Sequence, residues 1–100
     1  MKKPLTRDEK LANQLAELFS TLGDPSRVRI ITALLEGEKN VGPLADIVGI
    51  SESAISHQLR TLRQMRLVRS RKQGREVFYS LDDYHVVDLF QRGLDHVQHN

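Results

Sequence analysis

Apolar side chains recur every three or four residues through the first third of the chain, which is the spacing of one helix face. The pattern predicts an amphipathic helix over about residues 8–22 and a second helix over about residues 25–36. Asp24 is a good N-cap for the second helix, and Pro25 suits its first position because the missing N–H needs no partner there. The apolar face of the first helix consists of Leu11, Leu15, Leu18, Phe19 and Leu22.

The middle of the chain predicts two helices joined by a tight turn, which is the helix-turn-helix pattern. A short helix is expected to open at Pro43 and to stop at Gly49, and a longer one over about residues 52–66 follows the N-cap candidate Ser51. In this motif the second helix enters the major groove of DNA. Its polar stripe offers the hydrogen-bonding groups that a groove-reading face needs. The stripe consists of Ser53, Ser56, His57 and Arg60.

Strand-forming residues around a Gln73-Gly74 turn predict a β-hairpin over about residues 67–80. Arg71, Lys72 and Arg75 lie near its tip, where a wing beside a recognition helix contacts DNA phosphates. The expected fold class is therefore mainly α with a small β-hairpin, a winged helix-turn-helix formed as a single domain over residues 1–100. The extra helices at the two ends of the chain are expected to form a dimer interface.

Basic residues are concentrated on the predicted recognition helix and wing. Between Ser53 and Arg75 there are seven Lys or Arg residues and no acid, whereas the rest of the chain carries eight basic and thirteen acidic residues. This distribution is typical of a protein that binds a phosphate backbone, the alternative being a solvated basic face. Zero cysteines exclude disulfides and thiolate metal sites. With no membrane span and no signal peptide in the sequence, we expect a cytoplasmic protein.

Three of the four histidines fall on, or one residue after, a predicted final helix over about residues 83–98. His85 lies about 16 Å along the axis from His96, so the two cannot share an ion within one chain. Two antiparallel copies of the helix would bring Asp83 and His85 of one protomer to His96 and His99 of the other, twice per dimer. Asp83 must then lie in a frayed first turn, because helix positions i and i+2 point apart. The alternative is that the histidines are solvated helix ends.

One Asp and three His would complete a four-coordinate shell with no open position, which describes a binding site and not a catalytic one. The sequence contains no candidate nucleophile–base pair. We therefore expect no catalytic residues, no enzyme activity and no small-molecule substrate. A metal-storage protein is disfavoured as well, because storage has no need of a basic reading helix.

The segments LGDPSRVRII, SESAISHQLRTLRQMRLV and GREVFYSL make the chain resemble the ArsR/SmtB family of metal-sensing repressors over nearly its whole length. The resemblance implies a homodimer that binds an inverted-repeat operator in double-stranded DNA when metal-free. Metal binding then releases the operator and derepresses efflux or sequestration genes. Zinc-responsive members are similar in the pattern Asp-x-His, ten residues, His-x-x-His, which here is Asp83, His85, His96 and His99.

The resemblance also distinguishes between kinds of metal site. The cysteine-rich site that some members carry before the recognition helix is absent here. Residues 1–7 contain no histidine of the kind that nickel- and cobalt-responsive relatives recruit from an N-terminal arm. The lack of these N-terminal histidines favours four-coordinate Zn(II) or Co(II) over six-coordinate Ni(II). A nickel- or cobalt-responsive repressor, and one that answers a non-metal signal, stay open as alternatives.

By the same resemblance, the residues closest to DNA are Val41, Ser53, Ser56 and His57. For His57 a purely structural role is the alternative. Glu52 would repel phosphate, or could accept a hydrogen bond from a cytosine N4. In the resembling zinc sensors a ligating imidazole donates its second N–H to a backbone carbonyl where the recognition helix ends, which here is near Arg66.

Overall fold

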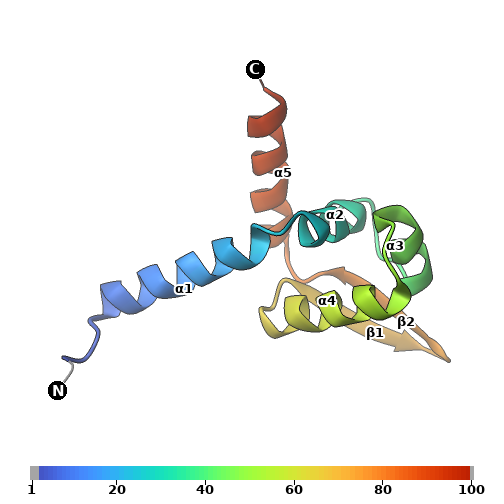
Figure 1. Cartoon of the computed structure of the whole chain (residues 1–100), viewed down its shortest axis with the longest axis horizontal. Coiled ribbons are helices and arrows are strands. Elements are labelled where there is room, and N and C mark those ends of the chain that lie inside the picture. Colours follow the sequence, from blue (N-terminus) through green and yellow to red (C-terminus); the bar gives the residue numbers. More distant parts are fainter. Residues whose placement is uncertain (1–2, 100) are drawn as a thin grey trace.

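A computed structural model describes residues 3–99 and shows a helical body that carries a hairpin, with a helix projecting from it at each end (Figure 1). The mainly α fold with one antiparallel hairpin confirms the expected fold class. Within the described residues, no helix has the length and apolar content needed to cross a membrane. The elements are α1 (Arg7–Leu22), α2 (Pro25–Leu34), α3 (Val41–Val48), α4 (Glu52–Gln64), β1 (Val68–Gln73), β2 (Glu76–Leu81) and α5 (Tyr84–Gln98).

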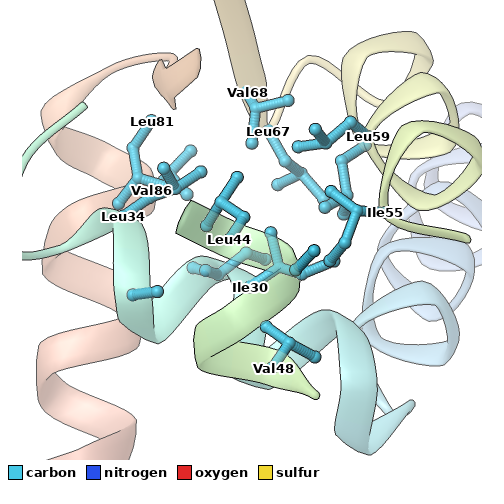
Figure 2. Close-up of a cluster of buried hydrophobic side chains, with 14 residues drawn as sticks. Ile30, Leu34, Leu44, Val48, Ile55, Leu59, Leu67, Val68, Leu81 and Val86 are labelled. Carbon is cyan, nitrogen blue, oxygen red and sulfur yellow. The ribbon is translucent and has the colours of Figure 1, made fainter. Parts of the chain in front are cut away.

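The core lies where α2, α3 and α4 meet the hairpin (Figure 2). Its members are the inward positions of each helix, and burying one such side chain contributes about 1.5–3 kcal/mol. The first turn of α5 joins this core through Val86, which is 8% exposed. The core therefore holds the helix-turn-helix and the wing as one body. Its fully buried large side chains are Ile30, Ile31, Leu44, Ile55, Leu59 and Leu62.

The helix-turn-helix is formed by α3 and α4. α3 begins at Val41, two residues before the predicted opening at Pro43, because proline is tolerated in a first turn whose N–H groups need no helical partner. Gly49 ends α3 with φ 78, a left-handed conformation that glycine adopts without strain. Ser51 then caps α4 as predicted, its hydroxyl accepting the Ala54 N–H at 3.1 Å. α2 and α4 each end two residues earlier than predicted.

The wing is a hairpin in which β2 is paired on both sides. The antiparallel ladder of β1 and β2 runs as far as Gln73, so Gly74 and Arg75 form the turn, one position later than predicted. The connection between α2 and α3 pairs with the other side of β2. There the Lys39 N–H donates to the Tyr79 carbonyl at 3.0 Å, and the Tyr79 N–H to the Lys39 carbonyl at 2.9 Å. β2 is thus the central strand of the wing.

The predicted apolar face of α1 is real, but it is not buried within the chain. α1 has no buried residue, and Leu11, Leu15 and Phe19 are each about half exposed (52%, 53% and 53%). Figure 1 shows why, because α1 and α5 leave the body in different directions. An open apolar hollow of about 370 Å³ lies where their faces approach, with Phe19 on one side and Phe90 on the other. Single-chain packing therefore leaves the apolar faces of both end helices partly uncovered.

Candidate functional site

The outer face of α4 is the candidate DNA-reading surface. All four residues of the predicted polar stripe are exposed, whereas Ile55, Leu59 and Leu62 on the opposite face are at most 1% exposed. This division agrees with the predicted buried and polar faces of the helix. Hydroxyl, imidazole and guanidinium groups in one exposed row can hydrogen-bond to base edges and phosphates. The exposed row is Ser53, Ser56, His57 and Arg60.

A half-buried hydrogen-bond network holds α4 against the joint between α1 and α2. Arg27 Nε donates to Gln58 Oε1 at 2.7 Å, and Gln58 Nε2 donates to Ser26 Oγ at 3.4 Å. Arg27 Nη1 also donates to the Thr21 carbonyl in the last turn of α1, at 3.2 Å. The network therefore links α4 to α2 and, through Arg27, to α1. Sequence reasoning missed it, and the available signal was an arginine three residues after the Asp24 cap.

The end of α3 is held from α2 in a similar way. Arg29 Nη1 donates to the Val48 carbonyl at 2.7 Å, and Nη2 donates to the Ile47 carbonyl at 2.9 Å. Carbonyls in the last turn of a helix lack intrahelical partners, and a cation there also interacts favourably with the helix dipole. Arg29 thereby fixes the end of α3 beside the turn into α4. At the other end of α3, Val41 is half-buried and packs against the core.

The three predicted basic residues of the wing have different surroundings. Lys72 and Arg75 are exposed near the hairpin tip. Arg71 is paired with Glu38 in the α2–α3 connection, and its guanidinium lies over the Phe78 ring. The Arg71 guanidinium holds the pKa of the Glu38 carboxyl below its usual value, and Glu38 in turn raises the pKa of Arg71. Glu38 was not among the residues that the sequence singled out.

Two of the four predicted metal ligands meet at the start of α5. Asp83 is the N-cap of the helix, with φ −149 and ψ 174, and its Oδ1 accepts the Val86 N–H at 3.1 Å. The same oxygen lies 3.6 Å from His85 Nδ1. The Val86 N–H, and after it the charge of His85, lower the pKa of Asp83. Side chains at positions i and i+2 of a helix point apart, but Asp83 lies outside the helix and can therefore approach His85.

The other two predicted ligands lie at the opposite end of α5. His96 is in the last turn, and His99 is the C-cap residue. Both are exposed beside Asp95 and Gln98, in a shallow, open hollow. Within residues 3–99 of one chain, no three potential metal ligands come together. A single chain therefore brings Asp83 to His85 and leaves His96 and His99 apart from them.

The donor atoms at the start of α5 suit a zinc-sized ion. Two ligands that each lie about 2 Å from a tetrahedral zinc are separated by about 3.3 Å. The 3.6 Å between Asp83 and His85 is close to that separation. His85 also stacks on Tyr84, with ring centroids 4.5 Å apart, which restricts the orientation of the imidazole. An imidazole and a carboxylate on an exposed helix end could supply half of a four-coordinate shell and need two further ligands from elsewhere.

Comparison with known proteins identifies the family. Residues 24–70 match the model of the family described as bacterial regulatory protein, arsR family. A transcriptional repressor SmtB homolog from Synechocystis sp. is 53% identical over 87 residues, which are 87% of this chain and 66% of the relative. A cadmium resistance transcriptional regulatory protein CadC homolog from Staphylococcus aureus is 38% identical over 96 residues, which are 95% of this chain and 78% of that protein.

Solved structures agree with this result. The solution structure of a homodimeric winged helix-turn-helix domain from Mycobacterium bovis, a possible ArsR-family regulator, is 26% identical. It aligns with a TM-score of 0.82 over 100% of this chain and 96% of its own length. The chain belongs to the arsR family of bacterial regulatory proteins, which are winged helix-turn-helix transcriptional regulators and not enzymes.

Proposed function

We propose that the protein is a metal-responsive transcriptional repressor, acting in the cytoplasm, whose homodimer binds an inverted-repeat operator and releases it when Zn(II) binds between the α5 helices. Co(II) is expected to substitute for Zn(II), because the two ions bind alike to Asp and His ligands. The observation that carries the proposal is the contact of Asp83 with His85 at one end of α5, while His96 and His99 are exposed at the other. The two halves of the shell lie on one helix and cannot close on each other.

A two-fold axis through the middle of α5 would complete the shell. If the two α5 helices run antiparallel, the start of α5 in each protomer lies beside the end of α5 in the other. Asp83 and His85 would then meet the partner's pair of histidines twice per dimer. The apolar hollow between α1 and α5 supports this arrangement, since a second chain would cover it. The Mycobacterium bovis neighbour is itself a homodimer, which also favours it.

Operator binding is assigned to α4 and the wing. Ser53, Ser56 and His57 at the N-terminal end of α4 would read base edges in the major groove, with Arg60 and the wing reaching phosphates. A dimer would present two such helices to successive major grooves, which is why the operator is expected to be an inverted repeat. The metal-sensing role agrees with the cadmium resistance regulator, to which the chain is similar.

Metal and DNA would oppose each other through the ends of α5 and α4. A ligating imidazole commonly donates its second N–H to an outer carbonyl. The end of α4 supplies a candidate near Arg66, which has a left-handed φ of 58. If that bond shifts the two reading helices out of register with the operator, metal and DNA each lower the protein's affinity for the other by the same factor. The corresponding coupling free energy is typically about 1–3 kcal/mol. His96→Ala should then bind metal weakly and, even at saturation, release DNA poorly.

The decisive experiment is a Co(II) titration of the metal-free protein followed by optical absorption, with Zn(II) as competitor. Intense visible d–d bands that saturate at one Co(II) per protomer and disappear with Zn(II) would support the tetrahedral site. His57→Ala is the matched control, because it removes the one histidine that is not a predicted metal ligand and should leave the bands intact. Weak bands would indicate a six-coordinate, nickel-type site. No binding at all would refute the metal-sensing part of the proposal and leave a repressor with another inducer.

A further inference from the structure

One basic residue of the wing is paired within the protein, with its side chain 51% exposed. Arg71 Nε lies 3.2 and 2.9 Å from the two carboxylate oxygens of Glu38, and Nη2 donates to the same carboxylate. Arg71 Nη1 donates to Gln73 Oε1 at 2.8 Å. The guanidinium carbon lies 4.6 Å from the centre of the Phe78 ring. All three nitrogens therefore have a partner, and one face of the guanidinium is covered by an aromatic ring.

The Arg71 side chain spans the width of the wing. In the ladder, Arg71 on β1 is opposite Phe78 on β2. On its far side β2 pairs with Lys39, and Glu38 immediately precedes Lys39. The guanidinium thus passes over the central strand to reach the α2–α3 connection. That connection runs directly into α3, which begins at Val41. The crossing ties the first strand of the wing to the start of the helix-turn-helix.

Lys72 and Arg75 are in the opposite situation. Both are exposed, and among residues 3–99 neither takes part in a side-chain hydrogen bond or an ion pair. Successive residues of a strand point to opposite faces, so Lys72 does not share the face of Arg71. The carboxylate of Glu38 also offsets the charge of Arg71 and would repel a nearby phosphate. The cations available to a DNA backbone are therefore those that lack such a partner.

We propose that Arg71 is a wing-positioning residue and not a phosphate contact. Through Glu38 and Phe78 it holds the hairpin at the angle from which Lys72 and Arg75 reach the DNA backbone. This inference rests on the proposed operator binding and replaces the expectation that Arg71 itself contacts phosphate. The two roles predict effects of opposite sign. A phosphate-binding Arg71 would be freed by removing the charge of Glu38 and would bind DNA more tightly, whereas a positioning Arg71 would lose its anchor and weaken binding.

The test measures fluorescence anisotropy with a labelled duplex of about three helical turns, which the wild-type protein has enriched from a random pool. Glu38→Gln and Arg71→Met are each expected to weaken binding on the order of fivefold, since an exposed ion pair contributes little more than that. The slope of log affinity against log salt should stay unchanged for both variants. Lys72→Ala is the matched control from the neighbouring position, and it should make this slope less steep by about 0.9, because one phosphate contact is lost.

A charge exchange separates positioning from general damage to the fold. The double variant Glu38→Arg with Arg71→Glu restores an ion pair across β2, so its affinity should return toward that of the wild type, while each reversed single variant stays weak. Glu38→Gln binding as tightly as the wild type or tighter, or Arg71→Met lowering the salt slope as much as Lys72→Ala, would overturn the inference alone. A wild-type protein that enriches no duplex would overturn the proposed operator binding, and the inference with it.

Discussion

The bond between Arg27 and Gln58 offers a direct test of how the recognition helix is held in place. It joins α2 to α4 over 31 positions of sequence at 2.7 Å, and both side chains are half-buried. A hydrogen bond to a charged group contributes about 1.5–3 kcal/mol, and partial solvent access places this one near the lower end. Gln58→Leu and Arg27→Met keep the size of each side chain and remove the bond. Together they should destabilise the protein by about 1–1.5 kcal/mol less than the sum of the single variants.

The assay is urea unfolding followed by circular dichroism at one fixed protomer concentration, because the stability of a dimer depends on that concentration. Arg27→Met also loses its bond to the Thr21 carbonyl, but this loss is common to the single and double variants and cancels in the cycle. Gln58→Glu is the control. It loses the donor to Ser26 but keeps the acceptor for Arg27 and makes it charged, so at neutral pH it should be more stable than Gln58→Leu.

A coupling free energy below about 0.3 kcal/mol would refute the reasoning, because independent sites add to within that margin. The bond would then be a contact without energetic consequence. If the reasoning holds, Gln58→Leu should also weaken operator binding without changing its salt dependence, since it alters the angle of α4 and removes no phosphate contact. A reduced salt slope would show instead that the variant has lost contacts with the DNA backbone.

Three further outcomes are expected. Leu62→Ala empties a fully buried position of α4 and should cost about 2–5 kcal/mol by urea unfolding, whereas Leu62→Met should be tolerated. Asp83→Ser keeps an N-cap for α5 but removes the carboxylate, so helicity and stability should persist while the Co(II) bands are lost. Asp83→Ala should lose the N-cap as well as the Co(II) bands. Unchanged bands in Asp83→Ser would exclude Asp83 as a ligand. The Ser26 hydroxyl and the Arg27 N–H hold the pKa of Asp24 below its usual 3.8. The folded pKa is thus the lower one, so the Asp24 contribution is complete above about pH 5 and is lost as the pH falls through the folded pKa. Asp24→Asn should show a smaller loss of unfolding midpoint between neutral and acid pH, and an equal loss would assign the acid sensitivity to other groups.

The helices, caps and hairpin were predictable because they depend on local chemistry. Asp24 and Ser51 accept backbone N–H groups of the helices that follow them, as their residue types predict. The alternation of apolar and polar positions along α4 determines which face is buried before any partner is known. Errors were confined to element ends, which shifted by up to two residues, and to the turn of the wing, which shifted by one, because such shifts cost little and neighbouring segments decide them. The start of α3 at Val41 is such a case.

The tertiary structure decided which side chains are already committed to others. Arg71 and Lys72 are adjacent in sequence and alike in charge, yet only Arg71 meets Glu38, because the fold brings the α2–α3 connection, 33 positions earlier in the sequence, beside the wing. In the sequence Gln58 is likewise only one more polar residue of a helix, and the fold alone brings Arg27 of α2 to it. Asp83 reaches His85 only because its backbone is extended at the helix cap. Residue types and spacing along the chain determine local structure and candidate ligands, whereas pairing between distant side chains depends on distances that only the folded backbone sets.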